Sequence, residues 1–211
     1  MSRTWLRQFS AFAVTAIWVS AVVSGIGVLQ RYANTPGQAA IPPHDWPAES
    51  QLLLSRHRPT LVVFAHPRCP CTRATLSELE SIMAQCHDRL TAHILFIQPD
   101  GVGADWRDTD LWTMADRIPG AIVTTDRNGQ ESRRFGAAIS GQAVLYSTGQ
   151  TLAFAGGITA SRGHVGANVG RSTIIEIVRP THEAGSTRNT CSVFGCPLQN
   201  TEWNDSGVRT K

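Results

Sequence analysis

Lysine and runs of like charge are almost missing from this chain of 211 residues. All but one of its 19 basic residues are Arg, and the formal net charge is only +3. Proteins that bind nucleic acid present a clustered basic surface, because much of their affinity comes from contacts with phosphates. Since no basic run occurs here, we expect no nucleic-acid partner.

Several catalytic signatures are also missing. No Gly-x-Ser-x-Gly elbow occurs, so the sequence does not predict a serine hydrolase. Paired carboxylates are not concentrated anywhere, which leaves a glycosidase-like site without support. The Gly-rich stretch 156–171 has neither the spacing of a P-loop nor that of a dinucleotide fingerprint. The chemistry that the sequence does offer is that of thiols, because the chain has five cysteines.

The N-terminus has the pattern of a membrane segment. Arg3 and Arg7 precede residues 9–29, which carry no formal charge. About 20 residues span a bilayer, whereas the hydrophobic part of a signal peptide has about 7–15. Trp5 and Tyr32 flank the segment as interfacial anchors do. We expect an uncleaved single-pass anchor in a bacterial inner membrane, with a cleaved signal as the alternative.

The remaining chain divides by composition. Positively charged flanks stay in the cytoplasm, so the chain after the anchor (1–32) is expected in the periplasm, where disulfides form. Residues 33–50 are rich in Pro, Gly and Ala and are predicted to be a linker. A folded domain is expected over 51–180, followed by a Cys-containing tail over 181–211.

Apolar strands alternate with amphipathic helices in the expected domain. Strands are predicted at 60–66, 91–98 and 121–125, and a hairpin at 142–146 and 151–155. Helices are predicted at 72–87, 108–117 and 168–179, with a helical turn at 131–135. This order predicts an α/β fold whose sheet is partly parallel and partly antiparallel.

Two cysteines separated by one proline lie between the first predicted strand and the first predicted helix. These are Cys69 and Cys71. The free N–H groups and the positive end of a helix favour a thiolate over a thiol. His66, Arg68 and Arg73 add positive or titratable charge nearby. The pattern indicates an activated thiol pair, with an incidental pair or a structural metal half-site as alternatives.

The other three cysteines are assigned different roles. Cys86 follows apolar residues at helical spacing and is predicted to be a buried structural thiol. Cys191 and Cys196 are predicted to form a local disulfide, because a short loop closes more readily than a long one. A relay between these tail cysteines and Cys69 or Cys71 is one alternative. A metal site built from both pairs is another.

Five short motifs narrow the comparison with known families. They are His66-Pro67-Arg68-Cys69-Pro70-Cys71-Thr72-Arg73, Ser140-Gly141-Gln142, Gly156-Gly157-Ile158-Thr159, Ser161-Arg162-Gly163-His164 and Val193-Phe194-Gly195-Cys196-Pro197-Leu198. Together with the order of elements over 48–180, they resemble the bacterial RedB-like proteins. These belong to the superfamily of thiol-disulfide oxidoreductases and peroxiredoxin-like proteins. The resemblance implies a thioredoxin-like mixed sheet flanked by helices, and a redox function.

The chain departs from the thioredoxin pattern at two places. Thioredoxins use Cys-x-x-Cys, so either Cys69 or Arg68 aligns with the family's nucleophile, and both alignments stay open. Thioredoxins also place a cis-proline before the strand at 142–146, where this chain has Gly141 by register. That proline helps to bind substrate and exclude metal. The run Pro-x-x-x-Thr-x-x-Cys of peroxiredoxins does not precede Cys69.

These residues predict a membrane-anchored extracytoplasmic thiol-disulfide oxidoreductase. We expect Cys69 to attack, Cys71 to resolve the mixed disulfide, and His164 to act as a base or ligand near them. The expected partners are a protein thiol or disulfide and a membrane or periplasmic redox protein, without a resident cofactor or metal. The alternative is a non-enzymatic protein that holds Cu(I) or Zn(II) on thiolates.

Overall fold

The computed structural model describes residues 3–86, 88–179 and 189–199, and the chain forms two compact units, 1–35 and 36–211. The first unit consists of helix α1 (Arg3–Asn34). Its segment Ser10–Asn34 has a mean hydropathy of 2.1 and is long and apolar enough to cross a membrane. An N-terminal signal sequence has the same properties, so the helix fits either a membrane anchor or a signal.

The second unit is built on a six-stranded sheet with the order β3-β2-β1-β4-β5-β6. Strands β1, β2 and β3 run parallel, β4 is antiparallel to both β1 and β5, and β6 is parallel to β5. Their bounds are β1 (Thr60–Ala65), β2 (Thr91–Gln98), β3 (Ala121–Arg127), β4 (Gln142–Tyr146), β5 (Leu152–Gly157) and β6 (Asn189–Thr190). Every residue of β1 is buried, which explains why its sequence is apolar from Leu61 to Ala65.

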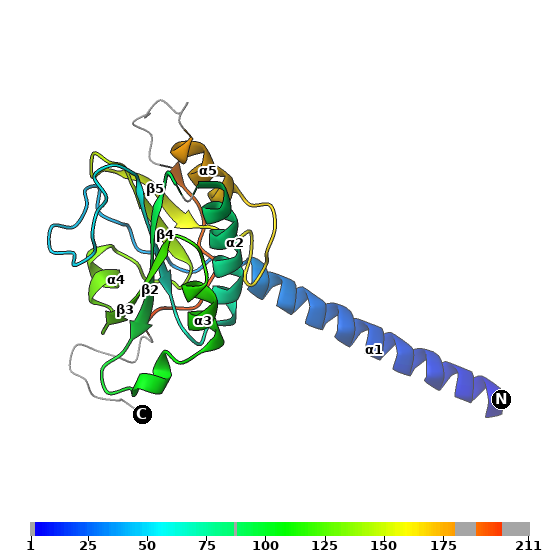
Figure 1. The fold of residues 1–211 in the computed structure, drawn as a ribbon. Coiled ribbons are helices and arrows are strands. Elements are labelled where there is room, and N and C mark those ends of the chain that lie inside the picture. The colour runs from blue at the N-terminus through cyan, green and yellow to red at the C-terminus, as the bar shows by residue number, and fades with distance from the viewer. Residues whose placement is uncertain (1–2, 87, 180–188, 200–211) are drawn as a thin grey trace. The chain divides into compact units, whose positions relative to one another are not determined.

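Helices cover both faces of the sheet (Figure 1). Helices α2 (Pro70–Cys86), α3 (Asp110–Asp116) and α5 (Val169–Val178) lie on one side, and the short α4 (Gln130–Arg134) lies on the other. A 3-10 turn, η1 (Ala104–Trp106), follows β2. All the helices and strands predicted within 51–180 are confirmed, with ends displaced by one or two residues.

The larger core lies between the sheet and α2, α3 and α5. Leu76, Leu79 and Met83 recur at helical spacing along α2 and pack against Leu61 and Val63 of β1. Burying such side chains contributes about 1.5–3 kcal/mol each. Cys86 lies in the same core and is only 2% exposed, which confirms its predicted place on the buried face. Burial raises the pKa of the Cys86 thiol.

The smaller core lies on the opposite face, beneath α4. Phe64, Phe135 and Tyr146 form its centre. Trp46 packs edge-on against two of these rings, with centroid distances of 4.9 Å to Phe135 and 5.2 Å to Tyr146. Edge-to-face pairs of this kind add about 0.5–1.5 kcal/mol beyond area burial. Trp46 therefore holds the chain that enters the domain against the sheet.

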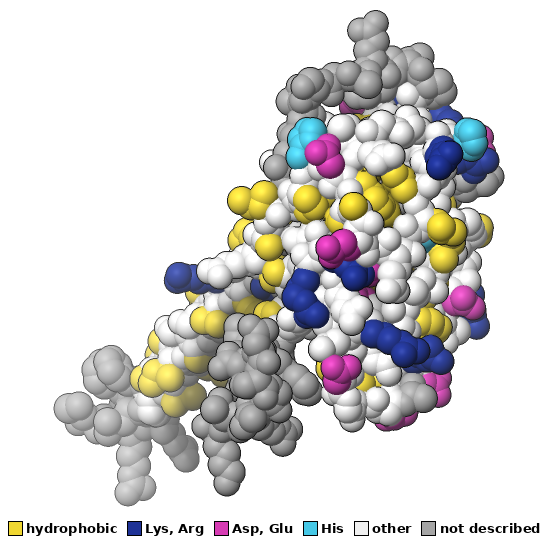
Figure 2. Space-filling model, turned by 90° about the vertical axis from the view of Figure 1, so that its left-hand side faces the viewer, with side chains coloured by type: hydrophobic (Ala, Val, Ile, Leu, Met, Phe, Trp, Pro, Cys, Tyr) yellow, Lys and Arg dark blue, Asp and Glu magenta, His cyan; other side chains and the backbone are white. Residues whose placement is uncertain are grey.

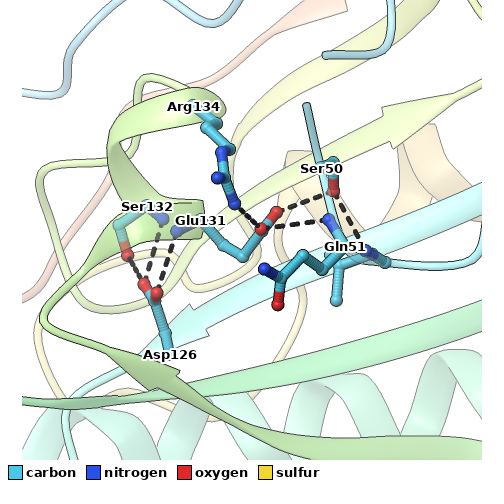
Figure 3. Close-up of polar contacts among 7 residues, drawn as sticks. Ser50, Gln51, Asp126, Glu131, Ser132 and Arg134 are labelled. Atoms are coloured by element: carbon cyan, nitrogen blue, oxygen red, sulfur yellow. Dashed lines mark hydrogen bonds and ion pairs between the residues drawn. The ribbon is translucent and has the colours of Figure 1, made fainter. Parts of the chain in front are cut away.

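Two buried carboxylates tie α4 to this entering segment (Figure 3). Asp126 accepts hydrogen bonds from the backbone N–H groups of Glu131 at 2.9 Å and Ser132 at 3.0 Å, at the start of α4. Glu131 accepts from Ser50 Oγ at 2.7 Å and from the Gln51 N–H at 3.1 Å. Because buried charges are costly when unpaired, these bonds fix α4 and residues 50–51 together.

The expected linker, 33–50, is packed onto the domain over much of its length. The Gly37 N–H donates to the Val193 carbonyl at 2.8 Å, and Tyr146 Oη donates to the Pro43 carbonyl at 2.9 Å. Asp45 forms a β-bridge with Thr151. A composition rich in Pro and Gly excludes regular elements, but it does not exclude packing. The segment predicted as a linker therefore also packs against the domain.

The expected tail, 181–211, also contributes to the domain within its described part, 189–199. Strand β6 extends the sheet next to β5, and Ile139 forms an isolated bridge with Pro197. A strand of only two residues is too short to show an alternating pattern in the sequence, so the sequence does not predict that the tail joins the sheet.

Among the described residues of the face in Figure 2, basic and acidic side chains are interspersed without a patch of one sign.

Candidate functional site

The first cysteine of the Cys-x-Cys pair lies at the junction between β1 and α2. Pro70 is the first residue of α2. The backbone N–H at this position has no acceptor within a helix, so proline, which lacks it, loses no hydrogen bond there. The Cys69 N–H donates to the His66 carbonyl at 3.2 Å, and the Thr72 N–H donates to the Cys69 carbonyl at 3.0 Å. These bonds form a tight turn that directs Cys69 inward, where it is only 2% exposed.

Three sulfur atoms meet at this junction. The Sγ atoms of Cys69, Cys71 and Cys196 all lie within 4.8 Å of one another. The sulfurs of Cys69 and Cys196 lie 3.0 Å apart. All of them are free thiols. The site is therefore a cluster of three cysteines, two from the helix start and one from the C-terminal segment.

The C-terminal segment is held beside the helix start by backbone contacts. The Ser140 N–H donates to the Cys196 carbonyl at 2.8 Å, and the Leu198 N–H donates to the Ala138 carbonyl at 2.8 Å. Gly195 lies so close to Ser140 that an added Cβ would be 1.8 Å from the Ser140 carbonyl oxygen. This close approach brings Cys196 over the helix start.

The predicted local disulfide between Cys191 and Cys196 is not formed. The Cys191 N–H donates to the Ala155 carbonyl at 3.1 Å, so this residue continues the contact between β5 and β6. Cys196 instead contacts Cys69. Short sequence separation favours closure only when the chain is free to close, and here both ends are fixed to the sheet. The structure thus has Cys191 and Cys196 as free thiols and places Cys196 beside Cys69.

A hydroxyl network joins the segments around the thiols. Thr72 Oγ1 donates to the His66 carbonyl at 3.0 Å and lies 3.0 Å from Ser140 Oγ. The His66 N–H donates to Ser140 Oγ at 3.0 Å. Because Ser140 also binds the Cys196 carbonyl, one residue links the end of β1, the start of α2 and the C-terminal segment.

The surroundings of Cys69 favour its thiolate. Burial acts against ionisation, but hydrogen bonds from the Cys196 thiol and from the backbone N–H groups of Cys196, Cys71 and Thr72 together lower the pKa of Cys69. An anion that accepts several N–H bonds at a helix N-terminus is stabilised in this way. Cys69 is thus the thiol of the cluster that ionises most readily.

The other two thiols are held neutral. Burial, and then the Cys69 charge, raise the pKa of Cys71. Burial, the hydrogen bond to Cys69 and the charges of Cys69 and Cys71 raise the pKa of Cys196 to about 12. The Arg162 guanidinium opposes both shifts. The cluster therefore combines one thiol whose ionisation is favoured with two whose ionisation is opposed, an arrangement suited to a nucleophile and its resolving partners.

The four predicted supporting residues differ in their positions. His66 packs edge-on against Trp106 with centroids 5.4 Å apart, and burial followed by the Arg68 charge lowers its pKa. Arg68 stacks over the same Trp106 ring at 4.4 Å. Arg73 forms an ion pair with Asp110 on α3.

The remaining predicted supporting residue, His164, has an exposed side chain, and no described contact joins it to the thiols. The cation beside the thiols is Arg162, which sequence reasoning left without a role. Its Nη1 atom donates to the Gly195 carbonyl, and its side chain forms a hydrogen bond with Cys71. It stands two residues before His164 in the same Gly-rich stretch. The motif Ser161-Arg162-Gly163-His164 contains both residues, and the acid–base and ligand chemistry of histidine favours His164 when the sequence alone is considered.

A buried ion pair fixes the loop that carries Arg162. Glu78 of α2 is 0% exposed, and its carboxylate accepts from the Gly166 N–H at 2.6 Å and pairs with Arg171 of α5 at 2.6 Å. Gly166 and Arg162 belong to the same connection between β5 and α5. Glu78 therefore positions Arg162 through this loop.

Gly141 occupies the position expected from the register. It lies immediately before β4 with φ of +90°, and its N–H donates to the Phe64 carbonyl at 2.7 Å. An added Cβ would be 2.8 Å from Thr75 Oγ1. Glycine is therefore required here by conformation and by space. The described residues contain no cis peptide bond.

Comparison with known proteins gives structural neighbours only. No protein-family model matches the chain, and no curated protein matches it. A hypothetical protein from Sinorhizobium meliloti superposes with a TM-score of 0.55 at 17% identity, over 82% of this chain and 96% of that chain. An uncharacterized conserved protein from Geobacillus kaustophilus gives 0.55 at 12% identity, over 82% and 94%. A secreted Mycobacterium tuberculosis disulfide oxidoreductase homologous to E. coli DsbE gives 0.40 at 14% identity, over 58% and 81%.

At these identities the likeness is one of fold. Three parallel strands, an antiparallel pair and helices on both faces form the mixed sheet predicted for this chain. The thiols lie where the first strand of this sheet meets its first helix. The domain therefore has a thioredoxin-like α/β fold, preceded by one apolar N-terminal helix.

Proposed function

We propose that the protein is a thiol-disulfide oxidoreductase in which Cys69 is the nucleophile and Cys196 the resolving thiol. The observation that carries the proposal is the 3.0 Å separation between the two sulfurs, with Cys69 favoured as thiolate. The sequence alone assigned resolution to Cys71. We propose Cys196 for that step because residues i and i+2 close a strained ring, whereas Cys196 approaches from a separate segment.

The exchange follows from these positions. The Cys69 thiolate attacks one sulfur of a substrate disulfide, forms a mixed disulfide and releases the first substrate thiolate. Cys196 then loses its proton, attacks Cys69 Sγ and releases the second thiolate. The substrate gains two electrons and the protein becomes a Cys69–Cys196 disulfide. The same steps in reverse transfer the disulfide to a substrate dithiol.

Resolution is timed by the charge on Cys69. In the resting state, burial, the hydrogen bond to Cys69 and the charge of Cys69 raise the pKa of Cys196. Once Cys69 is bound in a mixed disulfide, the hydrogen bond to its thiolate and its charge are lost, while burial remains and Arg162 still favours the Cys196 thiolate. Cys196 therefore ionises more readily after the nucleophile has reacted than before.

The proposed setting is the periplasmic face of a bacterial inner membrane, with α1 as an uncleaved anchor. The apolar Ser10–Asn34 segment, whose residues up to 29 carry no formal charge, follows Arg3 and Arg7 and supports this placement. The partners would be a protein thiol or disulfide and a membrane or periplasmic redox protein. Thiol exchange itself requires no resident cofactor. The Cys-x-Cys motif and the C-terminal Gly-Cys-Pro sequence support a RedB-like identity.

Alkaline phosphatase fused after residue 45 tests the anchor. We expect an active reporter that sediments with membranes, because Arg3 and Arg7 stay cytoplasmic and the apolar span is not removed. A fusion after residue 8 is the control and should be inactive. Active reporter in the soluble periplasmic fraction would mean that the segment is a cleaved signal.

The exchange mechanism is tested with the full chain in detergent. Thiols are blocked rapidly after reaction with a disulfide-bonded substrate protein, and the crosslinks are mapped on peptides. We expect Cys196→Ser to accumulate a mixed disulfide at Cys69, because the resolving sulfur is lost. Cys71→Ser should retain the Cys69–Cys196 crosslink, and Cys69→Ser should form no mixed disulfide.

Cys191→Ser is the matched control, because it removes the other C-terminal thiol, and it should behave as the wild type. Mixed disulfides that accumulate in Cys71→Ser but not in Cys196→Ser would return the resolving role to Cys71. Full exchange activity in Cys69→Ser would place the nucleophile elsewhere.

A further inference from the structure

The cluster contains more sulfur than disulfide exchange uses. Two thiols suffice for the exchange, yet Cys69, Cys71 and Cys196 all lie within 4.8 Å of one another. Three convergent sulfurs are a soft ligand set, and soft thiolates select Cu(I) or Zn(II) among biological metals. We infer that the reduced protein binds one Cu(I) ion through these three cysteines.

The sulfur positions fit a three-coordinate ion. Metal–sulfur bonds of about 2.3 Å in a trigonal plane hold the sulfurs about 4 Å apart. The cluster brackets this value, because the Cys69–Cys196 distance is 3.0 Å and no pair exceeds 4.8 Å. Binding therefore requires the sulfurs to move by about 1 Å, a shift that side-chain rotation can supply.

The number of ligands favours Cu(I) over Zn(II). Structural zinc takes four protein ligands, whereas Cu(I) is stable with three thiolates. Within the part of the chain that the structure describes, no His, Asp or Glu joins the three cysteines in a group of this size. His66 is occupied otherwise, because its Nδ1 atom accepts the Arg68 N–H at 3.1 Å and its ring packs against Trp106.

The charge of the site is compensated by nearby donors. Three thiolates around one Cu(I) ion carry a net negative charge, and a buried charge is costly without partners. Arg162 lies beside Cys71 and Cys196, and the N–H groups of Cys71 and Thr72 point at Cys69. The two N–H groups already favour the Cys69 thiolate in the metal-free site, and Arg162 favours ionisation of Cys71 and Cys196.

Copper binding and disulfide formation exclude each other. A Cys69–Cys196 disulfide would remove two of the three ligands, so only the reduced protein could hold the ion. This exclusion rests on the proposed function, in which that disulfide forms. Cys71 distinguishes the two activities. It is the third metal ligand, but it is not needed for the exchange between Cys69 and Cys196.

The test is an anaerobic titration of the reduced full chain in detergent. Cu(I), supplied as its acetonitrile complex, competes between the protein and the chromophoric chelator bicinchoninate. We expect one ion per chain and X-ray absorption that reports sulfur ligands alone. Cys69→Ser, Cys71→Ser and Cys196→Ser should each weaken binding by more than the roughly 100-fold loss that follows from altering outer-shell partners.

Cys86→Ser and Cys191→Ser are the controls and should bind as the wild type. Wild-type affinity in Cys71→Ser, absence of binding in the wild type, or a loss in Cys191→Ser would each overturn the three-cysteine site. These outcomes are separable from the exchange mechanism, because Cys71→Ser should still form the Cys69–Cys196 crosslink whether or not copper binds.

Discussion

Gly195→Ala is expected to remove most of the Cys69–Cys196 disulfide at equilibrium while leaving both cysteines in place. An added Cβ at residue 195 would be 1.8 Å from the Ser140 carbonyl oxygen. The opposing atom is backbone and cannot rotate away, so the segment carrying Cys196 has to move off. Overpacking of this kind costs about 1–3 kcal/mol. If this cost falls on the docking of the segment, it lowers the population of Cys196 beside Cys69 roughly five- to 150-fold.

The measurement is the equilibrium between dithiol and Cys69–Cys196 disulfide in glutathione buffers, followed by peptide mapping. Gly149→Ala is the matched control, since its Cβ would lie 3.5 Å from Ser147 Oγ, an ordinary contact. The control should keep the wild-type equilibrium. If Gly195→Ala also kept it, the observed contact between residues 195 and 140 would not determine the position of Cys196.

The sequence predicted the central part of the domain well because local patterns specify it. The buried strand β1, the helical spacing along α2 and the turn chemistry before α4 each depend on residues adjacent in the chain. The place of Cys69 followed from the same logic, since a strand followed by a helix brings the junction to one edge of the sheet. The buried position of Cys86 also followed from spacing alone.

The contacts between distant segments could not be predicted in this way. Cys196 reaches Cys69 through a chain of backbone bonds to residues 138 and 140, and none of these bonds has a sequence period. Arg162 is fixed through Gly166 and Glu78, which are 88 residues apart in the chain. The sequence therefore predicts the thiol chemistry of the site. It does not predict that Cys196 and Arg162 join the site, because long-range packing places them there.

Glu78→Gln is expected to be the most destabilising conservative substitution near the site. The Glu78 side chain is 0% exposed and pairs with Arg171, whose side chain is 24% exposed. A glutamine keeps the shape but removes the charge, and its NH₂ group would face either the Arg171 guanidinium or the Gly166 N–H. Removing one partner of a buried ion pair costs about 3–5 kcal/mol. That is a large part of the about 5–15 kcal/mol that stabilises a typical domain.

Urea unfolding of the full chain in detergent, followed by tryptophan fluorescence, measures this loss. Glu80→Gln is the matched control, because Glu80 is an exposed residue on the same helix, and it should change the free energy of unfolding by no more than about 0.5 kcal/mol. The loop that carries Arg162 is anchored by Glu78, so Glu78→Gln should also slow the resolution of mixed disulfides at Cys69. A stability within about 1 kcal/mol of the wild type would contradict the anchoring role of this ion pair. Slower resolution in Glu80→Gln would instead attribute the effect to the surface charge of α2.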